Sequence, residues 1–431
     1  MLAFALALGA IGCSGASPLG PTVSVASAPR GPAASSPATA PHAPACGLSP
    51  GAPSARIGAD KVAALRALAD QTDTDAFVIV EDGHVILNAG NGDRRYELMS
   101  VSKSIVSLAV GALVDRERLS LDQPVADFVP AWRGTPKEAI LVRHLLEHSS
   151  GLADERTTEK IYASADFVQF AIDAEAKDPP GTRFFYSNRA VNLLSGVVAT
   201  ASGQALDVWA RESLFAPLGI TDFGWSKDKA GNPHAMSGLQ MRPLDVAKLG
   251  QLVLDDGRWC GTQVVSGAWL EASTRTYQKP GFQPHGLLWW LSPENKRVVL
   301  SRDVFDAWRS SGVPDAWIAK LAPLEGRTFD PKDFHQAIFT AMTGRTDKPT
   351  DADLEPYFAM TWKAGRPDAA IELGAIRSIV ADGWGGQYIA IYPASKLVVV
   401  RLREINGPDD AKEPKRFLTE MEAILFPRPG G

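Results

Sequence analysis

The sequence predicts an α+β fold, in which an antiparallel β-sheet is flanked by helices and joined to a second, mainly helical lobe. Short apolar runs bounded by turn residues gather near the two ends of the chain, where they predict strands. Residues 100–300 instead carry apolar side chains at helical spacing. With 431 residues, 45% of them hydrophobic, the chain can bury a large core.

The predicted elements follow this division. Near the N-terminus we expect a helix over residues 61–70 and a hairpin of strands 76–81 and 85–89 around Asp82-Gly83. Near the C-terminus we expect three strands and a helix, at residues 376–381, 388–392, 397–402 and 417–425. The two chain ends would then share one sheet.

The first 56 residues predict export and a tether. Residues 2–11 form an apolar run that is too short to span a membrane and lies where a signal peptide would. It ends in Gly12-Cys13, which resembles a bacterial lipobox, so we expect residues 1–13 to be a signal peptide and Cys13 to be a possible lipidated membrane anchor. Residues 14–56 are rich in Ala, Pro and Ser and predict a disordered linker. The expected location is periplasmic or membrane-anchored.

Two further cysteines lie beyond the signal segment. Cys46 and Cys260 could form a disulfide in an oxidising periplasm, which would fix the end of the linker to the folded body. They could equally be two free thiols, because the sequence alone does not give connectivity.

The charge pattern argues against a nucleic-acid partner. The net charge of −5 is spread along the chain, and the sequence has no basic cluster, nucleotide-binding glycine loop or internal repeat. We expect a small-molecule or peptide-like substrate, and no cofactor.

A candidate nucleophile begins an apolar helical pattern at Ser100-Val101-Ser102-Lys103. Residues three apart share one helix face, so the Lys103 amine can approach the Ser100 hydroxyl and accept its proton. Alternatively, Ser100 is a helix-capping serine and Lys103 a surface lysine. The same spacing recurs at Ser226 and Lys229, where no apolar helix follows and a solvated loop is expected.

A second motif, Tyr186-Ser187-Asn188, supplies a phenol. The stretches around both motifs resemble the penicillin-recognising serine hydrolases, a family of class C β-lactamases, D-peptidases, esterases and 6-aminohexanoate-oligomer hydrolases. The pieces that carry the resemblance occur in family order: MSVSKSIVSLAVGALVD, VRHLLEHSSGL, PPGTRFFYSNRAVNLLSGVV, LFAPLGITDFGW, LGQLVLDDGRWCG, GLLWWL and GWGGQYIAIYP. The resemblance implies the β-lactamase/transpeptidase-like fold.

The resemblance also implies roles for these residues. Ser100 would attack an ester or amide carbonyl, and Lys103 and Tyr186 would share its proton. Asn188 would hold Lys103 and touch the substrate amide. Because the unperturbed pKa values of lysine and tyrosine are both near 10, the pKa of one group has to shift toward neutrality.

The family's oxyanion donors are the amide of the serine and an amide on a glycine-lined strand edge. Here that edge reads Trp384-Gly385-Gly386-Gln387, so Gly386 would let substrate approach and Gln387 would donate the second amide. Penicillin enzymes carry Lys or His where this chain has Trp384, which favours an esterase or amidase over a true β-lactamase. Trp384 would stack on substrate, or else pack within the sheet.

Other functions remain open at this point. One is a penicillin-binding or sensing lipoprotein that acylates without turnover. Another is a zinc peptidase, because His144, Glu147 and His148 match the H-x-x-E-H pattern on one helix face. The resemblance instead makes His148 structural, capping the helix end or bonding the loop backbone.

The expected catalytic domain covers residues 57–431, with its helical lobe at about 100–300. Residues 294–375 lie outside the resemblance and are expected to form an insertion. Aromatic residues recur there among charged ones and predict several short amphipathic helices: Trp308, Trp317, Phe329, Phe334, Phe339, Tyr357, Phe358 and Trp362. We expect either a cap over the groove or a structural decoration.

Overall fold

The computed structural model describes residues 46–154, 158–277, 284–361, 364, 366–405 and 414–427. The predicted signal peptide and lipobox, most of the predicted linker and Trp362 lie outside the described residues. The chain from Cys46 onward is one compact unit. No helix in the described ranges is long and apolar enough to cross a membrane.

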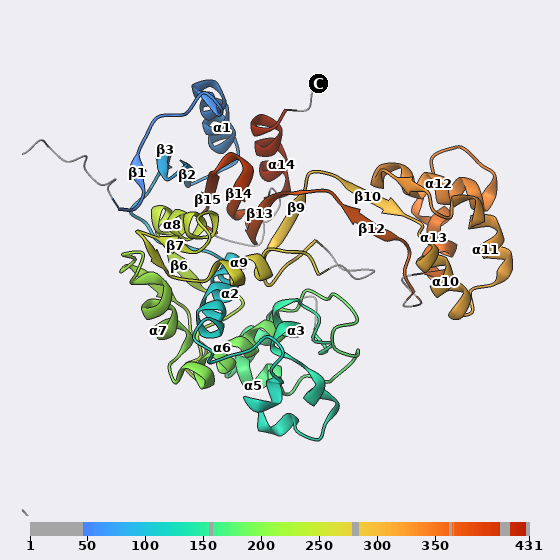
Figure 1. Ribbon diagram of the computed structural model, residues 1–431, viewed down its shortest axis with the longest axis horizontal. Coiled ribbons are helices and arrows are strands. Elements are labelled where there is room, and N and C mark those ends of the chain that lie inside the picture. The colour runs from blue at the N-terminus through green and yellow to red at the C-terminus, as the bar shows by residue number, and fades with distance from the viewer. Residues whose placement is uncertain are drawn as a thin grey trace, which may run out of the picture. The chain divides into compact units, whose positions relative to one another are not determined.

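A seven-stranded sheet forms the centre of this unit (Figure 1). In spatial order its strands are β1 (Ser49–Pro50), β3 (His84–Gly90), β2 (Ala76–Glu81), β15 (Leu397–Leu402), β14 (Gln387–Tyr392), β13 (Ile376–Gly383) and β9 (Trp290–Pro293). All neighbouring pairs are antiparallel except β1 and β3, which are parallel. The expected hairpin and the pairing of the two chain ends are confirmed, while the short parallel β1 makes the sheet mixed.

Both faces of the sheet are buried because successive side chains of its strands point to opposite sides. On one face, the C-terminal helix α14 (Pro414–Leu425) packs beside α1 (Gly58–Gln71), as Figure 1 shows. Phe77 of β2 meets Phe417 of α14 there, with ring centroids 5.6 Å apart. The opposite face carries α8 (Pro243–Leu254), which packs on β2, β14 and β15. The sheet is therefore the middle layer of three.

The helical lobe adjoins the α8 face. Besides α8 its helices are α2 (Val101–Val114), α3 (Val142–Leu146), α4 (Glu159–Ala163), α5 (Phe167–Ile172), α6 (Asn188–Ser202), α7 (Leu206–Ala210) and α9 (Gly267–Ser273). Two small sheets accompany them: β4 (Tyr96–Glu97), β6 (Leu239–Met241) and β5 (Phe223–Trp225), and the pair β7 (Arg258–Trp259) and β8 (Thr262–Gln263).

Helix α2 crosses the middle of this lobe and is buried from Val101 to Leu113. Gly111 allows this, because a Cβ atom built there would lie only 2.4 Å from the Trp269 ring of α9. The helix that carries the predicted nucleophile is thus fixed on every side by the core.

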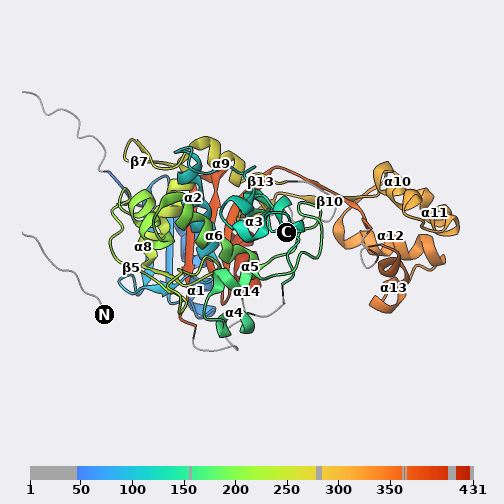
Figure 2. The same cartoon turned by 90° about the horizontal axis from the view of Figure 1, so that it is seen from below.

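The insertion has a hydrophobic core of its own. Its helices are α10 (Arg302–Ser310), α11 (Asp315–Leu321), α12 (Pro331–Thr343) and α13 (Asp351–Met360), grouped beside β10 in Figure 2. The predicted short helices are confirmed for the aromatic residues named above that the structure describes, except Phe329, which lies in a short strand. The sequence did not predict the three-stranded sheet β11 (Thr328–Phe329), β10 (Lys296–Val299) and β12 (Ala370–Leu373) against which α12 packs.

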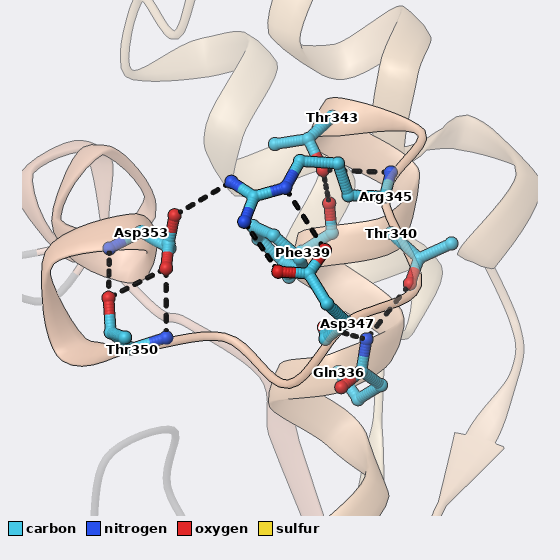
Figure 3. A network of polar contacts seen from close by, with 8 residues as sticks. All are labelled: Gln336, Phe339, Thr340, Thr343, Arg345, Asp347, Thr350 and Asp353. Carbon is cyan, nitrogen blue, oxygen red and sulfur yellow. Dashed lines mark hydrogen bonds and ion pairs between the residues drawn. The ribbon is translucent and has the colours of Figure 1, made fainter.

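A polar network fixes the connection between α12 and α13 (Figure 3). Arg345 binds Asp347 through two nitrogens and Asp353 through a third, at 3.1 Å. Asp353 also accepts the backbone N–H of Thr350 at 2.9 Å, which closes a capping box at the start of α13. The guanidinium lies 4.8 Å from the ring centroid of Phe339, so the network rests on the insertion core.

Cys46 and Cys260 form a disulfide, with Cα atoms 5.2 Å apart. The bond joins the start of the described chain to the turn between β7 and β8. The sequence left open a disulfide or two free thiols, and the structure shows the disulfide.

Candidate active site

Ser100 occupies the position just before α2. The preceding residue, Met99, has φ 49°, a left-handed conformation that turns the chain sharply into the helix. The Ser100 side chain makes no capping hydrogen bond to α2. The alternative of a capping serine is therefore wrong, and its hydroxyl is free to contact groups in the pocket.

Lys103 lies one turn into α2 and is only 3% exposed. Its Nζ is 2.9 Å from Ser100 Oγ, and it donates to the backbone carbonyl of Met236 at 2.7 Å. Burial lowers the pKa of Lys103 to about 7, although the nearby carboxylate of Asp154 opposes the shift. The surface-lysine alternative is wrong, and at neutral pH a large share of this amine is uncharged.

Tyr186 brings its phenol to the same place. Its ring stacks on Trp290, with centroids 5.8 Å apart, and Lys103 Nζ lies 5.1 Å from the ring centroid. Burial raises the pKa of Tyr186 to about 12, against the effect of its hydrogen bond with Ser100. The phenol therefore stays protonated at neutral pH, and the shift toward neutrality that the chemistry requires falls on the lysine.

These groups surround a small cavity of about 10 Å³. Its lining comes from the start of α2, the segment after α3, the residue pair before α6, residues 285–290 and the end of β13: Ser100, Lys103, Ser104, His148, Tyr186, His285, Leu288, Trp290 and Asp382. Ser104 Oγ donates to the Leu288 carbonyl at 2.6 Å, which fixes α2 against this segment. None of the described lining residues belongs to the insertion, so its role as a cap stays a prediction.

Asn188 does not hold Lys103. It is the first residue of α6, and no hydrogen bond joins it to Lys103 within the described residues. The acceptor for the lysine is instead the carbonyl of Met236, whose N–H is held by Asn192 Oδ1 at 3.1 Å. The Lys103 amine is therefore held by the Met236 carbonyl, and Met236 is in turn held by Asn192, one turn further along α6.

The glycine-rich segment forms a turn, not a free strand edge. Gly385 and Gly386 have φ 77° and 83°, Gly386 N–H donates to the Gly383 carbonyl at 3.1 Å, and Gln387 pairs with Gly383. The Gln387 side chain is occupied elsewhere, because it donates to the Arg403 carbonyl at 2.8 Å and accepts from its N–H at 2.9 Å.

Consequently Trp384, Gly386 and Gln387 are not among the cavity-lining residues, and Asp382 of β13 is the one that this hairpin supplies. Trp384 is 43% exposed, so the alternative of a tryptophan packed within the sheet is wrong. Its stacking on substrate stays a prediction.

Asp154 is a supporting residue that sequence reasoning missed. It accepts hydrogen bonds from Ser187 Oγ at 2.6 Å and from the N–H of Arg189 at 3.0 Å, which places its charge at the start of α6. A single aspartate in a loop has no sequence signature for such a role.

The H-x-x-E-H motif does not form a helix face. Helix α3 ends at Leu146, and His148 lies beyond it with φ 55°. His148 Nδ1 accepts the N–H of Ser187 at 3.1 Å, as the bond to loop backbone predicted, while His144 Nδ1 accepts the N–H of Leu141. Within the described ranges, no three His, Cys, Asp or Glu side chains are grouped to hold a metal ion.

Comparison with known proteins agrees with this architecture. A putative 6-aminohexanoate-dimer hydrolase from Bacillus anthracis superposes with a TM-score of 0.57 at 15% identity, over 84% of this chain and 80% of that one. A putative beta-lactamase from Bacteroides dorei DSM 17855 gives 0.54 at 17% identity, over 84% and 98%. The likeness shows a shared fold, the β-lactamase/transpeptidase fold.

Sequence relatives point the same way. A 6-aminohexanoate-dimer hydrolase from Paenarthrobacter ureafaciens is 29% identical over 47% of this chain and 57% of its own length, which is less than two thirds of that relative. The family model described as Beta-lactamase matches residues 62–420. Since that match spans most of the sequence, this chain belongs to the Beta-lactamase family.

Proposed function

We propose that this protein is a serine hydrolase that cleaves an ester or amide through an acyl-enzyme on Ser100. The observation that carries the proposal is the 2.9 Å contact between Ser100 Oγ and the buried Lys103 amine, whose pKa lies at about 7. A neutral amine at this distance can accept the hydroxyl proton as the oxygen attacks.

The rest of the cycle follows from the protonation states. Ser100 Oγ forms a bond to the carbonyl carbon while its proton passes to Lys103 Nζ. Tyr186, with a pKa of about 12, keeps its proton and can give it to the departing alkoxide or amine, regaining one from Lys103. Water then repeats the attack on the acyl carbon, and Ser100 leaves with the returned proton.

The substrate is more consistent with an ester or linear amide than with a β-lactam. Recognition of a penicillin carboxylate requires a cationic side chain near the glycine-rich segment. Here the hairpin of β13 and β14 carries Trp384 at its turn and the cavity-lining Asp382 beside it. The 6-aminohexanoate-dimer hydrolases among the relatives suggest a linear amide of an amino acid as one class to test.

A substrate panel tests the proposal. We expect a fluorophosphonate probe to label Ser100 and the enzyme to turn over p-nitrophenyl esters, with amides of 6-aminohexanoate and a penicillin in the same panel. Ser100→Ala should abolish labelling and turnover, while Ser226→Ala, from the second Ser-x-x-Lys match, should retain both. Turnover that survives Ser100→Ala would falsify the assignment, and labelling without turnover would identify a stalled, penicillin-binding type of protein.

A further inference from the structure

Two histidines beside the nucleophile have polar atoms without partners. His148 and His285 are 1% and 5% exposed, and both line the cavity that contains Ser100 and Lys103. Their ring centroids are 5.1 Å apart. Within the described part of the chain, His148 Nε2 and His285 Nδ1 are buried with no hydrogen-bond partner. Leaving such groups unpaired costs free energy, so each requires an explanation.

The hydrogen bond of His148 to the backbone determines whether its unpaired Nε2 atom is a donor or an acceptor. Its Nδ1 accepts the N–H of Ser187 at 3.1 Å, so the proton of the neutral ring lies on Nε2. Burial, together with His285 and Lys103, holds the pKa of His148 well below its usual value. Burial likewise lowers the pKa of His285 to about 3. The cavity therefore presents a neutral N–H donor and a neutral imidazole nitrogen that can accept.

The size of the cavity limits what can lie between them. A volume of about 10 Å³ corresponds to roughly one water molecule. A buried water is retained where it finds two to four polar partners, and here the donor, the acceptor and the Lys103 amine share one small space.

We propose that His148 Nε2 and His285 Nδ1 hold the water that hydrolyses the acyl-enzyme, an inference that rests on the proposed function. The water oxygen accepts from His148 Nε2–H, and one of its hydrogens points to His285 Nδ1. Its other proton passes to the neutral Lys103 amine as the oxygen bonds to the acyl carbon. The carbon–Ser100 bond then breaks, and Ser100 takes the proton back. The two histidines act as positioning residues.

Pre-steady-state kinetics with a p-nitrophenyl ester tests this, because the burst reports acylation and the later phase reports deacylation. We expect His148→Asn to keep the burst and slow deacylation about tenfold, the value of one hydrogen bond. Asparagine keeps an acceptor near the Nδ1 position and tolerates the positive φ of residue 148, so the bond to Ser187 survives. His285→Leu should do the same, and His285→Asn, which restores an acceptor near Nδ1, should recover most of the rate.

Comparison of kcat, KM and kcat/KM distinguishes a loss of water positioning from a general loss of active enzyme. When deacylation alone slows, kcat and KM fall together and kcat/KM is unchanged. The acyl-enzyme should also accumulate by intact mass in His148→Asn and His285→Leu. His335→Asn, on the exposed side of α12, is the matched control and should behave as wild type.

Normal deacylation in both folded variants, with the burst intact, overturns the water site and leaves the hydrolase proposal standing. If either variant fails to fold, as judged by its melting transition, the other decides. Absence of a burst and of Ser100 labelling in the wild type overturns the proposed function itself, and the water site with it.

Discussion

Asn192 Oδ1 accepts the backbone N–H of Met236 at 3.1 Å, and the carbonyl of Met236 accepts from Lys103 Nζ at 2.7 Å. The position of the amine relative to Ser100 therefore depends on a side chain one helical turn beyond the tyrosine motif. A neutral amine that donates one hydrogen to a fixed carbonyl has its lone pair directed elsewhere, and Ser100 lies 2.9 Å away.

Loosening this support should slow acylation. We expect Asn192→Ala to lower kcat/KM about tenfold, because Met236 loses the hydrogen bond that orients its carbonyl. Ester hydrolysis measured beside the melting temperature checks this. A folded variant with unchanged kcat/KM would show that Met236 needs no such support.

The pH dependence should report Lys103. Only its neutral form accepts a proton, so kcat/KM should rise as pH increases through about 7, the pKa of this amine. Tyr186 has to keep its proton and has a pKa of about 12, so the plateau should persist to at least about pH 10. A profile that falls through pH 7 would contradict the assignment of Lys103 as the base.

Removal of the amine should cost far more than removal of a surface lysine. We expect Lys103→Ala to lower kcat about 10²–10⁴-fold, the range for loss of a general base. Lys229→Ala, which belongs to the second Ser-x-x-Lys match and is exposed, should retain wild-type kcat. Equal effects of the two substitutions would argue against base catalysis by Lys103.

The disulfide should stabilise the described unit without affecting catalytic activity. It closes a loop of 214 residues, and we expect the double variant Cys46→Ser, Cys260→Ser to lose about 2–4 kcal/mol of unfolding free energy. Denaturant unfolding with and without reductant measures this. Reductant should lower the unfolding free energy of the wild type and leave that of the variant unchanged. An unchanged unfolding free energy of the reduced wild type would show that the bond adds no stability.

The insertion offers a contrast between core and surface. Trp308 is fully buried and donates to the Pro367 carbonyl at 2.7 Å, so Trp308→Ala should cost about 3–5 kcal/mol. Arg345, although at the centre of the network in Figure 3, is exposed, and Arg345→Ala should leave the unfolding midpoint nearly unchanged. Calorimetry distinguishes the two, and a large loss in Arg345→Ala would show that the network stabilises the insertion as a unit.

Much of this arrangement could be predicted from local patterns. The hairpin of β2 and β3 follows from two short apolar runs on either side of Asp82-Gly83, and the Ser100–Lys103 pair follows from helical spacing. Spacing alone did not separate that pair from Ser226 and Lys229; the apolar helix behind Ser100 did, because burial is what lowers the lysine pKa.

The rest depended on tertiary contacts with no sequence signature. The carbonyl that receives the Lys103 hydrogen bond belongs to Met236, and any residue could supply a backbone carbonyl. Gly385 and Gly386 fit either a substrate-lined edge or a turn, and only their positive φ values in the fold decide for the turn. His285 is a single histidine whose importance depends on which cavity its ring reaches.

Burying Lys103 sets function against stability. In the unfolded chain this amine has its ordinary pKa of 10.5, whereas in the fold it is about 7. Between these values the unfolded state binds more protons, so this residue makes the protein more stable as pH rises from 7 toward 10.5 and least stable where the amine must be charged inside the fold. Lys103→Met removes the buried amine, so this variant should be catalytically inactive and should have a larger free energy of unfolding than the wild type at neutral pH.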